Sequence, residues 1–170
     1  MKRFSIVLCV IFASIALPSL SSAKTKVELK DAQGKAIGDV IVWDQGAGVA
    51  LELQLHDLTP GEHAIHFHQV PKCDAPDFKS AGGHFNPGAK KHGFDSPDGH
   101  HAGDMKNFTV DAQGKAKAHL EDADVTLKDG PNSLLTNGGV AIVVHAKADD
   151  YKTDPSGSSG DRIACGVLTK

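Results

Sequence analysis

Histidines gather in the middle of the sequence at spacings that suit metal binding. His66 and His68 are separated by one residue within an apolar run, so on a β-strand their imidazoles project from the same face. A pair of this kind is more often a polar stripe on a half-exposed strand than a metal site, so further ligands must converge on it. Such candidates follow at intervals of eight, nine and three residues in a glycine-rich stretch: His84, His92, His101 and Asp104.

The donor types divide these residues into two overlapping sets. Three imidazoles and one carboxylate suit a zinc ion bound on four sides. Imidazole nitrogens alone suit copper, and His145, which ends an apolar run, supplies one more. The predicted zinc ligands are His84, His92, His101 and Asp104, and the predicted copper ligands are His66, His68, His84 and His145.

Motifs around these residues extend the pattern over nearly the whole chain. They are His66-Phe67-His68, Cys73, 80–87, His92-Gly93, 101–104, His145, Asp149-Asp150 and 160–166. In order and spacing this set resembles the copper/zinc superoxide dismutases. The resemblance implies an enzyme with copper and zinc as cofactors, which converts its substrate, the superoxide anion, into oxygen and hydrogen peroxide.

The resemblance also implies roles for individual residues. His84 would bridge both metals as an imidazolate, and in the family mechanism its bond to copper breaks on reduction while the imidazole takes up a proton. Arg162 would face the copper and guide the anion, so Arg162 and His84 are the predicted catalytic residues. Asp149 would hydrogen-bond one ligand of each metal, His66 and His92.

Other interpretations stay open. A non-catalytic extracytoplasmic protein that binds or stores copper and zinc would need the same ligands, although not Arg162. A zinc hydrolase is disfavoured, because the predicted zinc has no open position for water. His100 is a rival zinc ligand that does not keep the family interval. His63 is either a hydrogen-bonding support for a copper ligand or a solvated strand-end residue, and steering by Lys147 and Lys152 is left open.

The elements that must position these residues are short β-type runs separated by Gly, Asp and Asn. We therefore expect an all-β fold with antiparallel pairing, and the resemblance implies a Greek-key β-barrel or sandwich of immunoglobulin-like architecture. Asp-Ala-Gln-Gly-Lys occurs at 31–35 and 111–115 and predicts two hairpin turns. Segments 71–104 and 146–161 are predicted to be long functional loops. The predicted strands are 27–29, 40–43, 49–55, 63–68, 108–110, 116–120 and 140–145.

Residues 1–23 are predicted to be a signal peptide cleaved after Ala23. Lys2 and Arg3 precede an apolar stretch, 4–17, that is too short to span a bilayer. The mature domain would then be 24–170, in the periplasm or outside the cell, without a membrane segment. An even pair of cysteines in an exported chain points to a disulfide, which the resemblance also implies: Cys73 with Cys165.

The charge of the predicted mature chain limits its partners. Removing two basic residues from 18 leaves 16 against 21 acidic ones, a net charge of −5 with neutral histidines. This balance does not indicate a nucleic-acid partner. A homodimer is possible, and the sequence does not fix the oligomeric state.

Overall fold

The structure is a computed structural model that describes residues 23–170. The predicted signal peptide therefore lies outside the described residues, apart from Ala23. Within the described part the chain forms nine strands and two short 3-10 helices, η1 and η2, and none of its helices is long and apolar enough to cross a membrane. The elements are β1 (Lys24–Asp31), β2 (Ala36–Gln45), β3 (Gly48–Leu55), β4 (Gly61–His63), β5 (Ile65–His68), η1 (Lys79–Ala81), β6 (Phe108–Val110), β7 (Ala116–Asp122), η2 (Thr136–Gly138), β8 (Val140–His145) and β9 (Arg162–Leu168).

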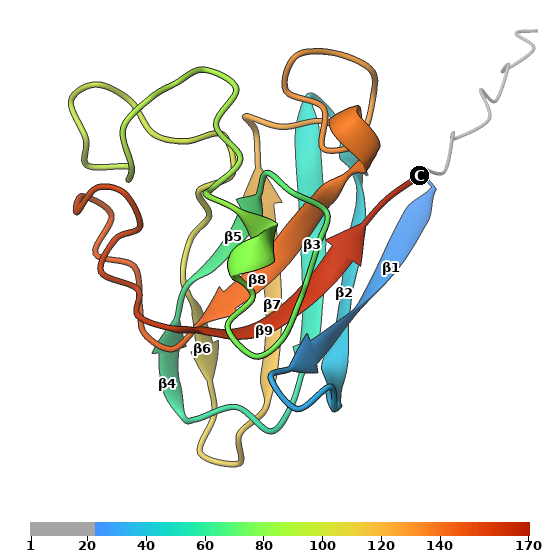
Figure 1. The fold of residues 1–170 in the computed structure, drawn as a ribbon, viewed down its shortest axis with the longest axis vertical. Coiled ribbons are helices and arrows are strands. Elements are labelled where there is room, and N and C mark those ends of the chain that lie inside the picture. Colours follow the sequence, from blue (N-terminus) through green and yellow to red (C-terminus); the bar gives the residue numbers. More distant parts are fainter. Residues whose placement is uncertain (1–22) are drawn as a thin grey trace, which may run out of the picture.

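The strands form a curled antiparallel sheet (Figure 1). Seven of the described strands pair in the order β5-β8-β9-β1-β2-β3-β7, and β4 pairs with β6. Only Ala64 separates β4 from β5, and a tight turn joins β6 to β7, so the two sheets close on each other as a barrel. After β3 the chain crosses to β4 instead of its neighbour β7, which is a Greek-key type of connection. The expected all-β barrel is confirmed.

Alternating apolar residues explain why these segments become strands. In β1 and in the second half of β3 the buried positions recur every second residue, as in Val27 and Leu29 or Leu51 and Leu53, and these side chains fill the barrel. Strand β8 is instead buried along its whole length. Its outer face is covered, because Val143 packs in a second apolar cluster formed with residues of the loop after β5 and of β9.

Both copies of the repeated pentapeptide form tight turns, but only the first is the predicted hairpin, because β6 and β7 do not pair with each other. In each turn the side chain of the aspartate, Asp31 or Asp111, accepts two backbone N–H groups at 2.9 Å. The glycine needs a positive φ, which is 79° at Gly34 and 74° at Gly114. The first turn joins paired strands, whereas the second joins strands of different sheets.

Two differences from the predicted strands matter for the site. The segment predicted as one strand, 63–68, is divided at Ala64, because its first part pairs with β6 and its second part with β8. Strand β9 was not expected from the sequence, yet it pairs with both β8 and β1. The two predicted loops are confirmed, since 69–107 joins β5 to β6 and 146–161 joins β8 to β9.

Candidate metal centre

The structure brings together all seven predicted metal ligands in two overlapping groups of buried side chains. In each group one possible ligand atom from every residue lies within 4.8 Å of the others. The four-histidine cluster consists of His66, His68, His84 and His145. The histidine–aspartate cluster consists of His84, His92, His101 and Asp104.

Barrel strands supply three members of the four-histidine cluster. Ile65 and Phe67 of β5 belong to the apolar core, so His66 and His68 lie on the opposite face of that strand. Pairing of β5 with β8 brings His145, the last residue of β8, beside them. Nε2 of His68 lies 3.4 Å from Nε2 of His145.

Two ring nitrogens in the four-histidine cluster are buried without a hydrogen-bond partner, Nδ1 of His66 and Nε2 of His84. An unpaired buried polar group costs about 1–3 kcal/mol. The second nitrogens of His66 and His68 are satisfied, because Nε2 of His66 lies 2.8 Å from an oxygen of Asp149 and Nδ1 of His68 lies 2.9 Å from a backbone oxygen. Nitrogen lone pairs left facing one another fit a copper ion.

The histidine–aspartate cluster is organised around one carboxylate. Oδ1 of Asp104 lies 2.7 Å from Nδ1 of His84, 3.1 Å from Nδ1 of His92 and 3.2 Å from Nδ1 of His101. Oδ2 of Asp104 accepts the backbone N–H groups of Gly93 and His101, which fixes the orientation of the carboxylate. Three imidazole nitrogens and an oxygen converging in this way fit a zinc ion.

Burial opposes protonation of the histidines in both clusters, but in the histidine–aspartate cluster hydrogen bonds to carboxylates counteract it at His92. Burial lowers the pKa of His84 to about 3 and also lowers the pKa values of His66, His68 and His145, so these rings are neutral. Burial opposes protonation of His92 as well, but hydrogen bonds to Asp104 and Asp149 raise its pKa to about 9. Neutral imidazoles have the lone pairs that metal binding requires.

One carboxylate links the two clusters. Oδ2 of Asp149 lies 2.8 Å from Nε2 of His66, and Oδ1 lies 3.0 Å from Nε2 of His92. The side-chain amide of Asn107 donates to the backbone oxygen of Asp149 at 2.9 Å and accepts the backbone N–H of Asp149 at 2.8 Å. Gly157 is needed beside it, because a Cβ there would stand 1.8 Å from Oδ1 of Asp149. Asp149 thus makes both of the predicted contacts, while Asn107 and Gly157 carried no recognisable signal in the sequence.

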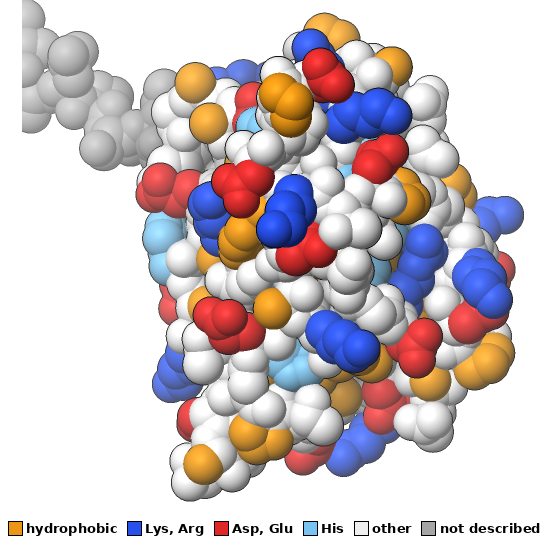
Figure 2. All heavy atoms as spheres, turned by 90° about the vertical axis from the view of Figure 1, so that its left-hand side faces the viewer, with side chains coloured by type: hydrophobic (Ala, Val, Ile, Leu, Met, Phe, Trp, Pro, Cys, Tyr) orange, Lys and Arg blue, Asp and Glu red, His pale blue; other side chains and the backbone are white. Residues whose placement is uncertain are grey.

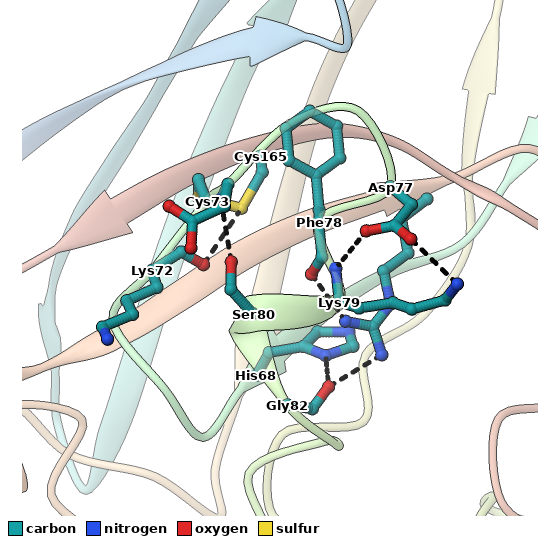
Figure 3. The surroundings of a disulfide bond; sticks show 11 residues. His68, Lys72, Cys73, Asp77, Phe78, Lys79, Ser80, Gly82 and Cys165 are labelled. Atoms are coloured by element: carbon teal, nitrogen blue, oxygen red, sulfur yellow. Dashed lines mark hydrogen bonds and ion pairs between the residues drawn. A yellow bond between two sulfur atoms is a disulfide. The ribbon is translucent and has the colours of Figure 1, made fainter.

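Arg162 lies on a cavity of about 470 Å³ that also reaches His68, His84 and His145. Its guanidinium donates to the backbone oxygens of Phe78 at 2.8 Å and Gly82 at 2.7 Å. The oxygen of Gly82 also accepts from Nδ1 of His68 (Figure 3). The cavity therefore combines four-histidine cluster atoms with a positive charge.

The disulfide between Cys73 and Cys165 is present and joins the long loop after β5 to β9 (Figure 3). It holds the segment that supplies Phe78 and Gly82 against the strand that begins with Arg162. On the face that carries both long loops, acidic and basic side chains are interspersed (Figure 2). The charge at the cavity is therefore local, and Lys147 and Lys152 do not line it.

The structure also places the two histidines whose roles the sequence left open, His63 and His100. His63 is buried, and its Nδ1 lies 2.7 Å from the backbone oxygen of His145, so it supports the backbone at a cluster residue and is not solvated. His100 is outside both clusters, and its Nε2 lies 3.0 Å from a carboxylate oxygen of Asp124.

Comparisons with known proteins agree with this fold and site. Residues 27–168 match the family described as copper/zinc superoxide dismutase. The chain is 44% identical over 163 residues to superoxide dismutase [Cu-Zn] 1 of Aquifex aeolicus (strain VF5), covering 95% of each chain.

Two solved structures are also similar. A point mutant of a SOD-like protein from Bacillus subtilis has a TM-score of 0.84 and 41% identity, with 87% of this chain and 100% of that one covered. The Cu/Zn superoxide dismutase of Brucella abortus has a TM-score of 0.71 and 27% identity, with 86% and 99% covered. The chain belongs to the copper/zinc superoxide dismutase family.

Proposed function

We propose that this protein catalyses the dismutation of superoxide, with copper bound by the four-histidine cluster and zinc by the histidine–aspartate cluster. The observation that carries the proposal is that His84 belongs to both clusters. Its Nδ1 lies 2.7 Å from Oδ1 of Asp104, while its Nε2 is buried without a partner in the four-histidine cluster. Relatives named Cu-Zn superoxide dismutase support the same assignment.

In the proposed reaction two superoxide anions and two protons give one molecule of oxygen and one of hydrogen peroxide. One anion loses an electron and the other gains it. Copper supplies this one-electron chemistry when it is bound, whereas zinc is redox-inactive. His84 would hold one of the protons at Nε2 while that nitrogen is not bonded to copper. Arg162 attracts the anion into the cavity although the chain as a whole is acidic.

We further propose that residues 1–23 are a signal peptide and that 24–170 function in the periplasm or outside the cell. A disulfide between Cys73 and Cys165 supports an oxidising compartment. The organisms named for the relatives are bacteria, which have such compartments. A homodimer stays a prediction.

The proposal is tested by metal analysis and a superoxide assay on the purified protein. We expect about one copper and one zinc per chain and rapid loss of superoxide. Binding of both metals without turnover would favour the storage function, and rejection of copper by a folded protein would exclude the enzyme.

Charge reversal at Arg162 tests the path of the anion. We expect Arg162→Glu to lower the rate about tenfold or more at low salt without changing metal content, because electrostatic attraction raises encounter rates by about 10–1000-fold. Lys147→Glu is the matched control, since that exposed lysine does not line the cavity. Added salt should lower the reaction rate of the wild-type protein and reduce the difference in rate between wild type and Arg162→Glu. Equal rates for both variants at low salt would remove the steering role.

A further inference from the structure

Ser159 lies beside His145 in a way that the sequence did not indicate. The residue is 0% exposed, although it belongs to the loop between β8 and β9. Its hydroxyl oxygen lies 3.1 Å from Nδ1 of His145. Burying a hydroxyl is unfavourable unless it is hydrogen-bonded, so this contact accounts for a serine at an otherwise enclosed position.

The backbone fixes both residues of this contact. The N–H of Ser159 bonds to Ser156 at 3.2 Å, and its carbonyl oxygen accepts the N–H of Lys147 at 2.9 Å. His145 is held by the oxygen of Ala64 at 2.9 Å and by Nδ1 of His63 at 2.7 Å. The hydroxyl and the ring therefore meet in one defined arrangement.

The two ring nitrogens of His145 have different surroundings. Nε2 faces the four-histidine cluster, 3.4 Å from Nε2 of His68. Nδ1 faces two oxygens, the hydroxyl of Ser159 at 3.1 Å and the backbone oxygen of Gly160 at 3.4 Å. A proton on Nδ1 has acceptors, and it leaves the lone pair on Nε2 free for a metal.

The outer partners of the strand-held histidines differ in kind. His66 bonds to the carboxylate of Asp149 and His68 to the backbone oxygen of Gly82. His145 has a hydroxyl as its nearer partner. Outer hydrogen bonds fix ring orientation and raise ligand basicity, so each partner sets how strongly its histidine donates to the metal.

We propose that Ser159 is a positioning residue for His145, whose Nδ1–H it accepts, so that Nε2 is held toward copper and donates more strongly to it. This inference rests on the proposed function, because it takes the four-histidine cluster as the copper site. Ser159 itself does not touch the metal or the anion.

The test compares Ser159→Ala with Ser158→Ala, which removes an exposed hydroxyl from the neighbouring residue. The first measurement is nitrogen-detected NMR of the histidines in zinc-loaded, copper-free protein. We expect a slowly exchanging Nδ1–H on His145 in wild type and Ser158→Ala. In Ser159→Ala its signal should shift and its exchange with solvent should become several-fold faster. The same spectra show whether each variant is folded.

The second measurement is Cu(II) affinity by chelator competition, with the electron paramagnetic resonance spectrum of the bound ion. We expect Ser159→Ala to bind Cu(II) about tenfold more weakly and to change the spectrum, whereas Ser158→Ala should match wild type. Unchanged Nδ1–H exchange and unchanged copper affinity in folded Ser159→Ala would overturn the inference. Copper binding without superoxide turnover in wild type would instead contradict the proposed function, and the Ser159 measurements would still stand.

Discussion

The two clusters of the metal centre are built in different ways. Three members of the four-histidine cluster stand on β5 and β8, where antiparallel pairing fixes their positions. Every member of the histidine–aspartate cluster lies in the loop 69–107, which has no continuous sheet ladder and pairs with β5 only through isolated bridges, His84 with His68 and Asp104 with His66. The loop is also held by side-chain contacts, chiefly those of Asp104 with three imidazoles and two backbone N–H groups.

This difference indicates which part of the site is preformed. The barrel places His66, His68 and His145 through the same pairing that stabilises the fold. The loop depends instead on its isolated bridges to β5 and on the contacts made by Asp104, by Asp149 and by the disulfide. His84 belongs to the loop and to both clusters. It therefore connects the ligands held by the strands to the ligands held by the loop.

His84→Ala should have the largest effect, because it removes the one residue shared by both clusters. We expect about a thousandfold loss of superoxide turnover, or about 4 kcal/mol. In wild type the Cu(II) spectrum should change when zinc is removed, and in the variant it should not. His100→Ala is a suitable control because it removes a neighbouring histidine outside both clusters. A variant spectrum that still responds to zinc would place the bridge on another histidine.

Removing the disulfide should loosen the loop more than the strands. The bond joins residues 92 positions apart, and losing it should lower the free energy of unfolding by about 3 kcal/mol. Urea unfolding of Cys73→Ser/Cys165→Ser measures this, and reduced wild-type protein should behave alike. Limited proteolysis should then cut within 69–107 first. Protection of this loop equal to that of wild type would show that the disulfide does not order it.

Asp149→Asn should weaken both sites together, because the amide replaces an acceptor that serves His66 and His92. We expect zinc affinity to fall about 10–100-fold. The factor by which zinc raises copper affinity should also fall, and by linkage it equals the factor by which copper raises zinc affinity. Competition with chelators measures both. Asp150→Asn is the control, since Asp150 bonds only to residues of its own loop. Loss of zinc affinity with unchanged coupling would contradict the linking role.

Asp122 of β7 is the site of the smallest predicted effect. Unlike the carboxyl group of Asp104, that of Asp122 is not fully hydrogen-bonded. Asp122 is 5% exposed, and one of its oxygens has no partner. Burial raises its pKa from 3.8 to about 7, and Asp124 and Asp104 add to the increase. The unfolded chain is then ionised while the folded one keeps its proton, so this group lowers stability as pH rises from about 4 through 7.

Asp122→Asn should remove this dependence. Between pH 6 and 8 the free energy of unfolding should shift in favour of the variant by about 1 kcal/mol relative to wild type. Urea titrations of the metal-loaded proteins across this range measure the shift, since bound metals keep the ligand histidines from titrating. A difference that does not vary with pH would show that Asp122 is ionised throughout.

The sequence predicted the strand-held part of the site better than the part held in the loop. His66 and His68 were predicted to share a face from their spacing alone, and strand alternation produces that result. His92 and Asp104 were predicted as zinc ligands from their donor types and intervals, but the contacts between them could not be derived, because a loop has no period. Ser159 and Asn107 were missed, since a serine or an asparagine in a polar segment is ordinary and only the folded chain reveals its neighbour. Strand β9 was missed because Gly166 and Cys165 weaken its alternation.

In the proposed function, the two backbone oxygens that bind Arg162 restrict how it meets the anion. A guanidinium has five N–H donors, and two of them are committed to Phe78 and Gly82. Three are not committed to these bonds, on a side chain that the two backbone oxygens hold in place. Little has to rearrange when the anion enters, and little holds the product when it leaves. Such an arginine favours fast association and dissociation of the anion over tight binding, as a site with rapid turnover requires.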